Sequence, residues 1–214
     1  MNYLAHAHLA HYSDEAILGA ILGDFVRGQS ALADWPAVVR QEILRHRQID
    51  SYTDSHPETM QLRNLFAKGE RRYAGIVLDM YFDHCLARDW SRWSDKSLTQ
   101  FCQRVYRILN TDLHRLPAPL AAQAPLMQAH DWLGNYQHLT GTARAIAGIA
   151  RRLSRNGERL VACFHTLVQH QAEADAAFAR FFPQLLHDFP MPSEHPNLAH
   201  ESVTLDTRLA QCRY

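Results

Sequence analysis

The sequence predicts an all-α protein, and three observations support this fold class. Apolar residues recur at helical spacing along most of the chain. No segment sustains the alternation of apolar and polar residues that marks a half-buried strand, and no glycine-rich phosphate loop is present. With 214 residues, of which 47% are hydrophobic and 21% charged, the chain suits one soluble domain with a substantial core.

Capping and breaking residues divide the first half of the chain into helices. Ser13 or Asp14 is suited to cap a long second helix after a short first one. Residues 29–36 form a small, polar stretch that we expect to be a loop, with Pro36 suited to the first turn of the next helix. That helix should stop near Asp54, because a proline three residues later disfavours helical geometry before it.

The second half is punctuated in the same way. Lys68-Gly69 breaks one helix, Pro117-Ala-Pro119 forms a connection, and Asn156-Gly157 signals a turn. After Pro183 the periodicity is lost, so we expect a helical domain over 1–187 and a weakly ordered or surface-packed tail over 188–214. The expected helical segments share apolar residues at helical spacing and lie at about 1–28 (a short and a longer helix), 36–54, 57–67, 71–90, 97–110, 120–127, 132–139, 140–153 and 158–182.

Charge and cysteine usage exclude several classes of protein. Lysine plus arginine and aspartate plus glutamate number 22 each, so no overall basic surface for nucleic acid is expected. The four cysteines are widely spaced, which argues against a zinc knuckle or a dense disulfide framework. No signal-peptide pattern or membrane-length apolar run is present. We therefore expect a cytoplasmic protein without a membrane partner; no feature indicates its oligomeric state.

The stretch from Leu44 to Glu58 gathers possible metal or phosphate ligands. His46, Asp50 and Asp54 recur every four residues, and side chains at that spacing lie about 5–6 Å apart on a helix. This is a distance at which two side chains can bind one cation. The alternative is a solvated helix face whose charged residues form ordinary ion pairs.

A second stretch, residues 76–90, repeats this spacing in an apolar setting. Asp79 and Asp83 are four residues apart, and His84 follows directly. A buried carboxylate is costly unless it is paired or bound to a cation, so at least one of the two should meet a partner inside the protein. Asp24 also lies among apolar neighbours, late in the expected second helix, where it could join the same pocket or pair with Arg27.

Four motifs, in this order along the chain, resemble the bacterial acyl carrier protein phosphodiesterases. They are Asn-Tyr-Leu-Ala-His-Ala-His-Leu-Ala (2–10), Gly-Asp-Phe-Val-Arg-Gly (23–28), His-Arg-Gln-Ile-Asp (46–50) with Thr-Asp (53–54), and Leu-Asp-Met-Tyr-Phe-Asp-His (78–84). The resemblance extends over about residues 1–93 and more loosely to about 185. It implies a helical bundle like that of the HD phosphohydrolases, of which this family is a non-standard branch.

The resemblance also implies a reaction. It is hydrolysis of the phosphodiester that joins phosphopantetheine to a serine of holo acyl carrier protein, giving the apo protein, in cytoplasmic fatty-acid metabolism. The family prefers manganese, and magnesium is a possible substitute. The sequence departs from the ordinary HD pattern because its adjacent pair is inverted, as Asp83-His84.

Hydrolysis of a phosphodiester near neutral pH needs a cation, and carboxylates with imidazoles suit manganese or magnesium. On this basis we assign expected roles to residues of all four motifs. The expected metal ligands are Asp24, His46, Asp50 and Asp79. Asp83 or His84 is expected either to support these ligands from outside the metal shell or to act as an acid/base group. Arg27 and Arg47 are the expected phosphoryl-binding groups. Asn2, His6 and Asp54 could orient ligands, although a capping or core role would suit Asn2 and His6 equally.

The substrate protein implied by the resemblance is small and acidic, so arginines should surround the pocket mouth. The candidates come from the site-bearing segments and from the densest basic run, and they are Arg45, Arg71, Arg72, Arg88, Arg151 and Arg152. A solvated face is the alternative for each cluster. Two rival functions remain, namely an HD-type phosphohydrolase acting on a nucleotide or small phosphoester and a non-enzymatic helical binding domain.

Overall fold

The computed structural model describes residues 1–192 and confirms the all-α class, because that part of the chain contains eleven α-helices and no strand. Its longer helices enclose one continuous apolar core. The helices are α1 (Tyr3–Leu9), α2 (Asp14–Leu22), α3 (Gln29–Ala33), α4 (Ala37–Ser55), α5 (Pro57–Arg63), α6 (Arg71–Arg88), α7 (Leu98–Thr111), α8 (Ala118–Ala129), α9 (Leu139–Arg152), α10 (Gly157–Gln169) and α11 (Gln171–Asp188), with 3-10 turns η1 (Trp90–Arg92), η2 (Leu113–Arg115) and η3 (Gly134–Gln137).

The N-terminal helices follow the predicted order but differ in extent. Ser13 caps α2, since its side chain accepts a hydrogen bond from the Ala16 amide at 3.0 Å. The helix ends at Leu22, so Asp24 lies in the following turn and not late in the helix as expected. The expected loop over 29–36 contains the short helix α3, which buries only Leu32.

Helix α4 begins and ends where the sequence predicts. It starts after Pro36 and runs to Ser55, one residue beyond Asp54. His56 then adopts extended backbone geometry, and its ring accepts a hydrogen bond from the Glu58 amide at the start of α5. Helix α5 stops at Arg63, earlier than the expected end near residue 67.

The long helix expected over 158–182 is two helices. Helix α10 ends at Gln169, His170 leaves helical geometry, and α11 continues to Asp188 with Pro183 inside it. The first residues of the expected tail pack on the domain, because the Arg45 guanidinium donates to the carbonyl of Phe189 at 2.6 Å. Residues 193–214 of that tail lie outside the described part of the chain.

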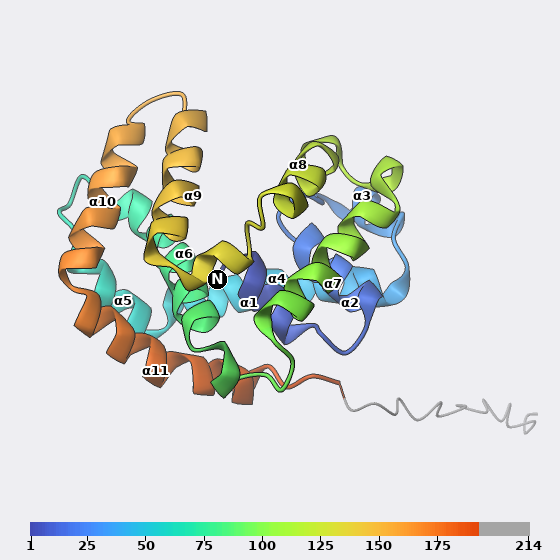
Figure 1. Ribbon diagram of the computed structural model, residues 1–214, viewed down its shortest axis with the longest axis horizontal. Coiled ribbons are helices and arrows are strands. Elements are labelled where there is room, and N and C mark those ends of the chain that lie inside the picture. The colour runs from blue at the N-terminus through green and yellow to red at the C-terminus, as the bar shows by residue number, and fades with distance from the viewer. Residues whose placement is uncertain (193–214) are drawn as a thin grey trace, which may run out of the picture.

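The N-terminus and α6 occupy the middle of the molecule (Figure 1). In this view, α9 and α10 lie on the left of the N-terminus, and α2, α3, α7 and α8 lie on its right. Helix α11 runs along the lower edge. Tyr81 and Phe82 of α6 are completely buried. No helix in residues 1–192 combines the length and apolar character needed to cross a bilayer.

Candidate metal centre

The centre begins with two side chains one turn apart on α4. His46 Nε2 lies 3.1 Å from one carboxylate oxygen of Asp50. The other ring nitrogen of His46, Nδ1, lies 2.6 Å from the carbonyl of Ala20 in α2 and is placed to donate its proton there. In the neutral ring this hydrogen bond leaves the lone pair of Nε2 directed at the carboxylates, which is how metal-binding histidines are usually oriented.

A glycine makes room for the His46 ring. A Cβ atom at Gly23 would lie only 2.2 Å from Cγ of His46, so any larger residue would push the ring away. One turn earlier, a Cβ atom at Gly19 would lie 2.6 Å from the carbonyl oxygen of Val39. The two glycines therefore let α2 approach α4 closely, and Gly23 specifically accommodates the imidazole.

His6 joins the centre from α1. Its Nε2 lies 2.9 Å from the second oxygen of Asp50, and its ring stacks on that of His46 with centroids 3.7 Å apart. Within the described residues, His6, His46 and Asp50 are the one group of at least three such side chains whose ligand atoms all lie within 4.8 Å of each other. From the sequence we expected only a supporting role for His6, because 40 residues of chain separate it from His46.

Asp24 approaches the same nitrogen of His46 as Asp50 does, and its carboxylate lies 3.4 Å from Nε2. Burial disfavours a proton on His46, but hydrogen bonds with Asp24 and Asp50 outweigh it and raise the pKa of the ring to about 9. Burial also disfavours ionisation of Asp50, and hydrogen bonds from His46 and His6 nevertheless hold the pKa of that carboxyl well below its usual range. The two carboxylates therefore favour a positive charge on His46, whereas burial and the neighbouring His46 lower the pKa of His6 to about 4.

The donor set fits a divalent cation. Two imidazole nitrogens and the oxygens of Asp50, with Asp24 nearby, form a mostly hard set of the kind that binds manganese or magnesium. His6 Nδ1 is buried without a hydrogen-bond partner, so only its Nε2 is engaged. A hollow of about 310 Å³ opens beside the centre, and its walls include Asp24, Arg27, His46, Arg47 and Asp50.

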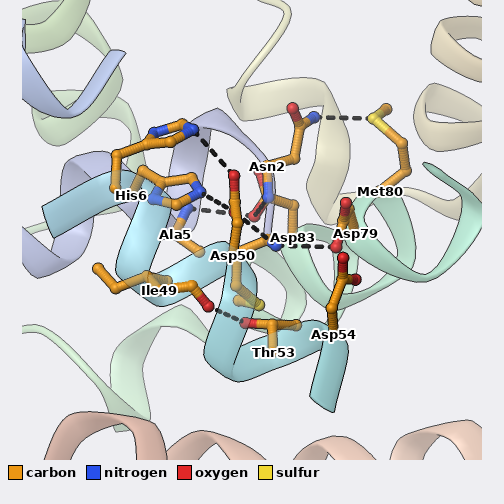
Figure 2. A network of polar contacts seen from close by, with 12 residues as sticks. Asn2, Ala5, His6, Ile49, Asp50, Thr53, Asp54, Asp79, Met80 and Asp83 are labelled. Carbon is orange, nitrogen blue, oxygen red and sulfur yellow. Dashed lines mark hydrogen bonds and ion pairs between the residues drawn. The ribbon is translucent and has the colours of Figure 1, made fainter. Parts of the chain in front are cut away.

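Asp79 lies near this group but outside it. Its carboxylate accepts a hydrogen bond from the amino group of Met1 at 2.8 Å, and the same amino group lies 3.5 Å from Asp50. In the view of Figure 2, His6 and Asp79 lie on opposite sides of Asp50. The structure thus places an ammonium group between the two carboxylates, and the ligand role expected for Asp79 stays a prediction.

Asp83, for which we expected an acid/base role, lies against the start of α1. It is completely buried, and its two oxygens accept hydrogen bonds from the backbone amides of Leu4 at 2.8 Å, Ala5 at 3.1 Å and Asn2 at 3.3 Å. These are the free amides at the start of α1, so Asp83 caps the helix that carries His6. Its side chain does not line the hollow beside the centre.

Comparison with known proteins now decides the family. The family model described as acyl carrier protein phosphodiesterase matches residues 1–185. The chain belongs to the acyl carrier protein phosphodiesterase family. Curated relatives with that name include proteins of Photorhabdus laumondii (35% identical, covering 87% of this chain and 93% of the relative) and Yersinia pestis (32% identical, 87% and 96%). No solved structure matches the chain.

The remaining predicted residues of this phosphodiesterase-family chain lie apart from the centre. His84 is placed to donate from Nδ1 to the carbonyl of Tyr136 at 2.7 Å, which ties α6 to η3. Asp54 pairs with Arg63 at 2.6 Å. Asn2 donates to the sulfur of Met80 at 2.7 Å (Figure 2). The roles expected for these three residues stay predictions, and the structure gives each an intramolecular partner.

The predicted docking arginines fall into two groups. Those with partners include Arg45, which donates to backbone carbonyls, and Arg88, which pairs with Asp89 and Asp175. Arg71 donates to the carbonyl of Phe66, and the guanidinium of Arg72 lies over the ring of Tyr73. Arg151 and Arg152 are exposed in the last turn of α9 and form no ion pair in the described part of the chain.

Proposed function

We propose that this protein hydrolyses the phosphodiester between phosphopantetheine and a serine of holo acyl carrier protein, which releases the apo protein. The observation that carries this proposal is the convergence of His6, His46 and Asp50 on one point beside an open hollow. The name shared by its relatives supplies the substrate. Water adds to phosphorus, the bond from phosphorus to the serine oxygen breaks, that oxygen gains a proton, and the phosphate stays on pantetheine.

The chain's own residues have distinct parts in this proposal. His6, His46 and Asp50 hold a divalent ion, with Asp24, whose carboxylate also lies near Nε2 of His46, as a further ligand. Manganese or magnesium bound there would screen the phosphoryl oxygens and lower the pKa of a bound water. Asp79 is not one of these ligands in the proposal. It holds the amino group of Met1, which also contacts Asp50.

Arg27 and Arg47 bind the phosphoryl oxygens. Both line the hollow beside the ligands, and both are exposed, so an incoming phosphate can reach them. The Arg47 guanidinium is held in place by a hydrogen bond to the carbonyl of Val26 at 2.6 Å. Charge-assisted hydrogen bonds from arginine to phosphate are among the stronger polar contacts in proteins, so these two side chains would orient the diester for attack.

The test is conversion of purified holo acyl carrier protein to the apo form, followed by mass spectrometry. Conversion should require a divalent ion, stop after exhaustive chelation and resume on addition of Mn²⁺ or Mg²⁺. Free nucleotides and small phosphoesters, assayed in parallel, should be hydrolysed far more slowly. Conversion that persists without any metal would contradict the proposed centre, and a preference for nucleotides would favour the rival phosphohydrolase.

A further inference from the structure

A second and larger cavity lies beside the metal centre. It has a volume of about 670 Å³ and is enclosed by the start of α1, α6, η3 and α9. Cavities of this size are typical of sites for small organic ligands. We call it the α9 cavity, and Gln123 of α8 also lines it.

The segments that contain α1 and α6 each have residues in the wall of the α9 cavity and residues at or beside the metal centre. On α1, the cavity residue Asn2 precedes His6 by four positions, which is about 6 Å along a helix. On α6, the cavity residue Met80 follows Asp79, whose ammonium partner lies 3.5 Å from Asp50. A chain molecule with its phosphate at the metal centre would therefore have the α9 cavity within reach.

Tyr3 marks the border between the two spaces. It lines the α9 cavity, and its ring stacks on Phe25 with centroids 6.2 Å apart. Phe25 directly follows Asp24 of the metal centre. Burial, and then the charge of Asp24, raise the pKa of the Tyr3 hydroxyl, whereas the charge of Arg152 lowers it. The charges of Asp24 at the metal centre and of Arg152 at the cavity thus both act on Tyr3.

The lining of the α9 cavity contains both side-chain amides and apolar groups. Asn2, Gln123 and Asn135 contribute side-chain amides, while Trp132 and Ile149 contribute apolar surface. A pantetheine arm has the complementary composition. It contains two amide bonds separated by two methylene groups, and a dimethyl-substituted carbon lies near the end that carries the phosphate. Its amides could exchange hydrogen bonds with the cavity amides while its carbon chain covers the apolar wall.

Three arginines of α9 line the outer part of the cavity. Arg144, Arg151 and Arg152 are exposed, and none of them pairs with a carboxylate within residues 1–192. They therefore provide free positive charge beside the cavity. An acidic carrier protein that delivers its prosthetic arm would meet these charges, which would steer its approach.

We infer that the α9 cavity binds the pantetheine arm of the substrate while the phosphate of that arm lies at the metal centre. This inference rests on the proposed function. It assigns a binding site to the pantetheine part of the substrate, which the metal centre does not contact. It also gives Arg144, Arg151 and Arg152 one role, contact with the carrier protein at the mouth of the cavity.

Gly148 offers a way to close the cavity without disturbing the fold. A Cβ atom there would find nothing nearer than Arg151 Nη2 at 3.9 Å, so a larger side chain has space in the cavity. By contrast, a Cβ atom at Gly141 would lie 2.0 Å from the carbonyl oxygen of Asn135, where α9 packs tightly on η3. Ala147 is the matched control position, because it lies on the same helix but does not line the cavity.

The experiment is calorimetric titration of the metal-loaded protein with pantetheine, which lacks the phosphate. Wild type and Ala147→Leu should bind it equally, and Gly148→Leu should bind it at least tenfold more weakly. Leucine favours helix over glycine, so the variant should keep its melting temperature; the smaller Gly148→Val replaces it if it does not fold. No binding to wild type, or equal binding by Gly148→Leu and Ala147→Leu, would overturn the inference.

The same proteins separate this inference from the proposed function. If the inference holds, Gly148→Leu should lower kcat/KM for holo acyl carrier protein at least tenfold, and Ala147→Leu should leave it within twofold. If wild type converts the carrier protein but does not bind pantetheine, the cavity assignment fails while the proposed function stands. If wild type binds pantetheine in a Gly148-dependent way but converts no carrier protein, the proposed function fails.

Discussion

Two stretches with the same spacing of acidic residues have different fates in this protein. On α4, His46 and Asp50 face α1 and the end of α2 and converge with His6 on an open hollow. On α6, Asp79 holds the Met1 amino group and Asp83 caps α1. Spacing places side chains on one helix face, but the groups opposite that face decide the role. The imidazole nitrogens opposite Asp50 can exchange their protons for a cation, whereas the backbone amides opposite Asp83 can only donate hydrogen bonds to it.

The largest expected effect is on the α4 side of this comparison. Asp50→Asn keeps the shape of the side chain but removes charge from the metal centre, so kcat/KM for holo acyl carrier protein should fall roughly a hundredfold or more. Asp54→Asn is the matched control, because Asp54 lies one turn further on α4 and pairs with Arg63. Its activity should stay within about threefold. Near wild-type turnover by Asp50→Asn would contradict the assignment of Asp50 as a metal ligand.

A second change tests whether Gly23 is needed for the position of His46. Gly23→Ala places a methyl group where the His46 ring now lies, so the ring must move and the affinity for Mn²⁺ should fall about tenfold. Gly19→Ala strains the same helix pair against the Val39 carbonyl without touching His46. Both variants should melt at a lower temperature than wild type, but only Gly23→Ala should lose metal affinity. Equal loss by both would mean that α2 packing in general, and not the glycine at 23, positions the ligand.

A substitution of Asp83 on α6 should lower the unfolding free energy more than it affects activity. Asp83→Ala leaves three backbone amides at the start of α1, two of them buried, without their acceptor, and an unsatisfied buried donor costs about 1–3 kcal/mol. Denaturant unfolding should therefore show a loss of at least about 1 kcal/mol, with a smaller loss of activity per folded molecule than Asp50→Asn. The opposite balance, unchanged stability with a hundredfold loss of activity, would restore the acid/base role first expected for Asp83.

The smallest effect expected is a difference in pH dependence. Burial raises the pKa of Asp83 from 3.8 to about 7, although three backbone amides oppose the shift. The folded protein therefore holds this proton more tightly than the unfolded chain, and the contribution of Asp83 to the unfolding free energy should fall between about pH 4 and pH 7. Asp83→Asn cannot titrate, so its unfolding free energy should fall less over this range. Identical pH slopes for both proteins would show that the Asp83 carboxyl is ionised throughout.

Local signals in the sequence predicted most of the helices. Caps and prolines act over a few residues, so Ser13 and Pro36 mark the starts of α2 and α4 correctly. The break at His170 was missed because no glycine or proline marks it and the apolar spacing continues on both sides. Helix α3 was missed because it buries a single residue and shows no periodicity.

The site was predictable only where its residues share a helix. The spacing of His46 and Asp50 gave their proximity directly, because residues four apart on a helix are neighbours. The approach of His6 depends on how α1 packs against α4, and no spacing in the sequence records that packing. The capping contacts of Asp83 were missed for the same reason, since a carboxylate that caps a distant helix looks like a catalytic one in the sequence.

The central claim is that His6, His46 and Asp50 together hold one divalent ion, and His6 tests it best because only the structure brings it to the site. The measurement is titration of the metal-free protein with Mn²⁺, with free Mn²⁺ followed by electron paramagnetic resonance. Wild type and His11→Asn, a control for a histidine outside the group, should bind one ion per chain with equal affinity. His6→Asn should bind at least tenfold more weakly. If His6→Asn binds Mn²⁺ as wild type does, His6 is not a ligand and the three-residue centre is contradicted.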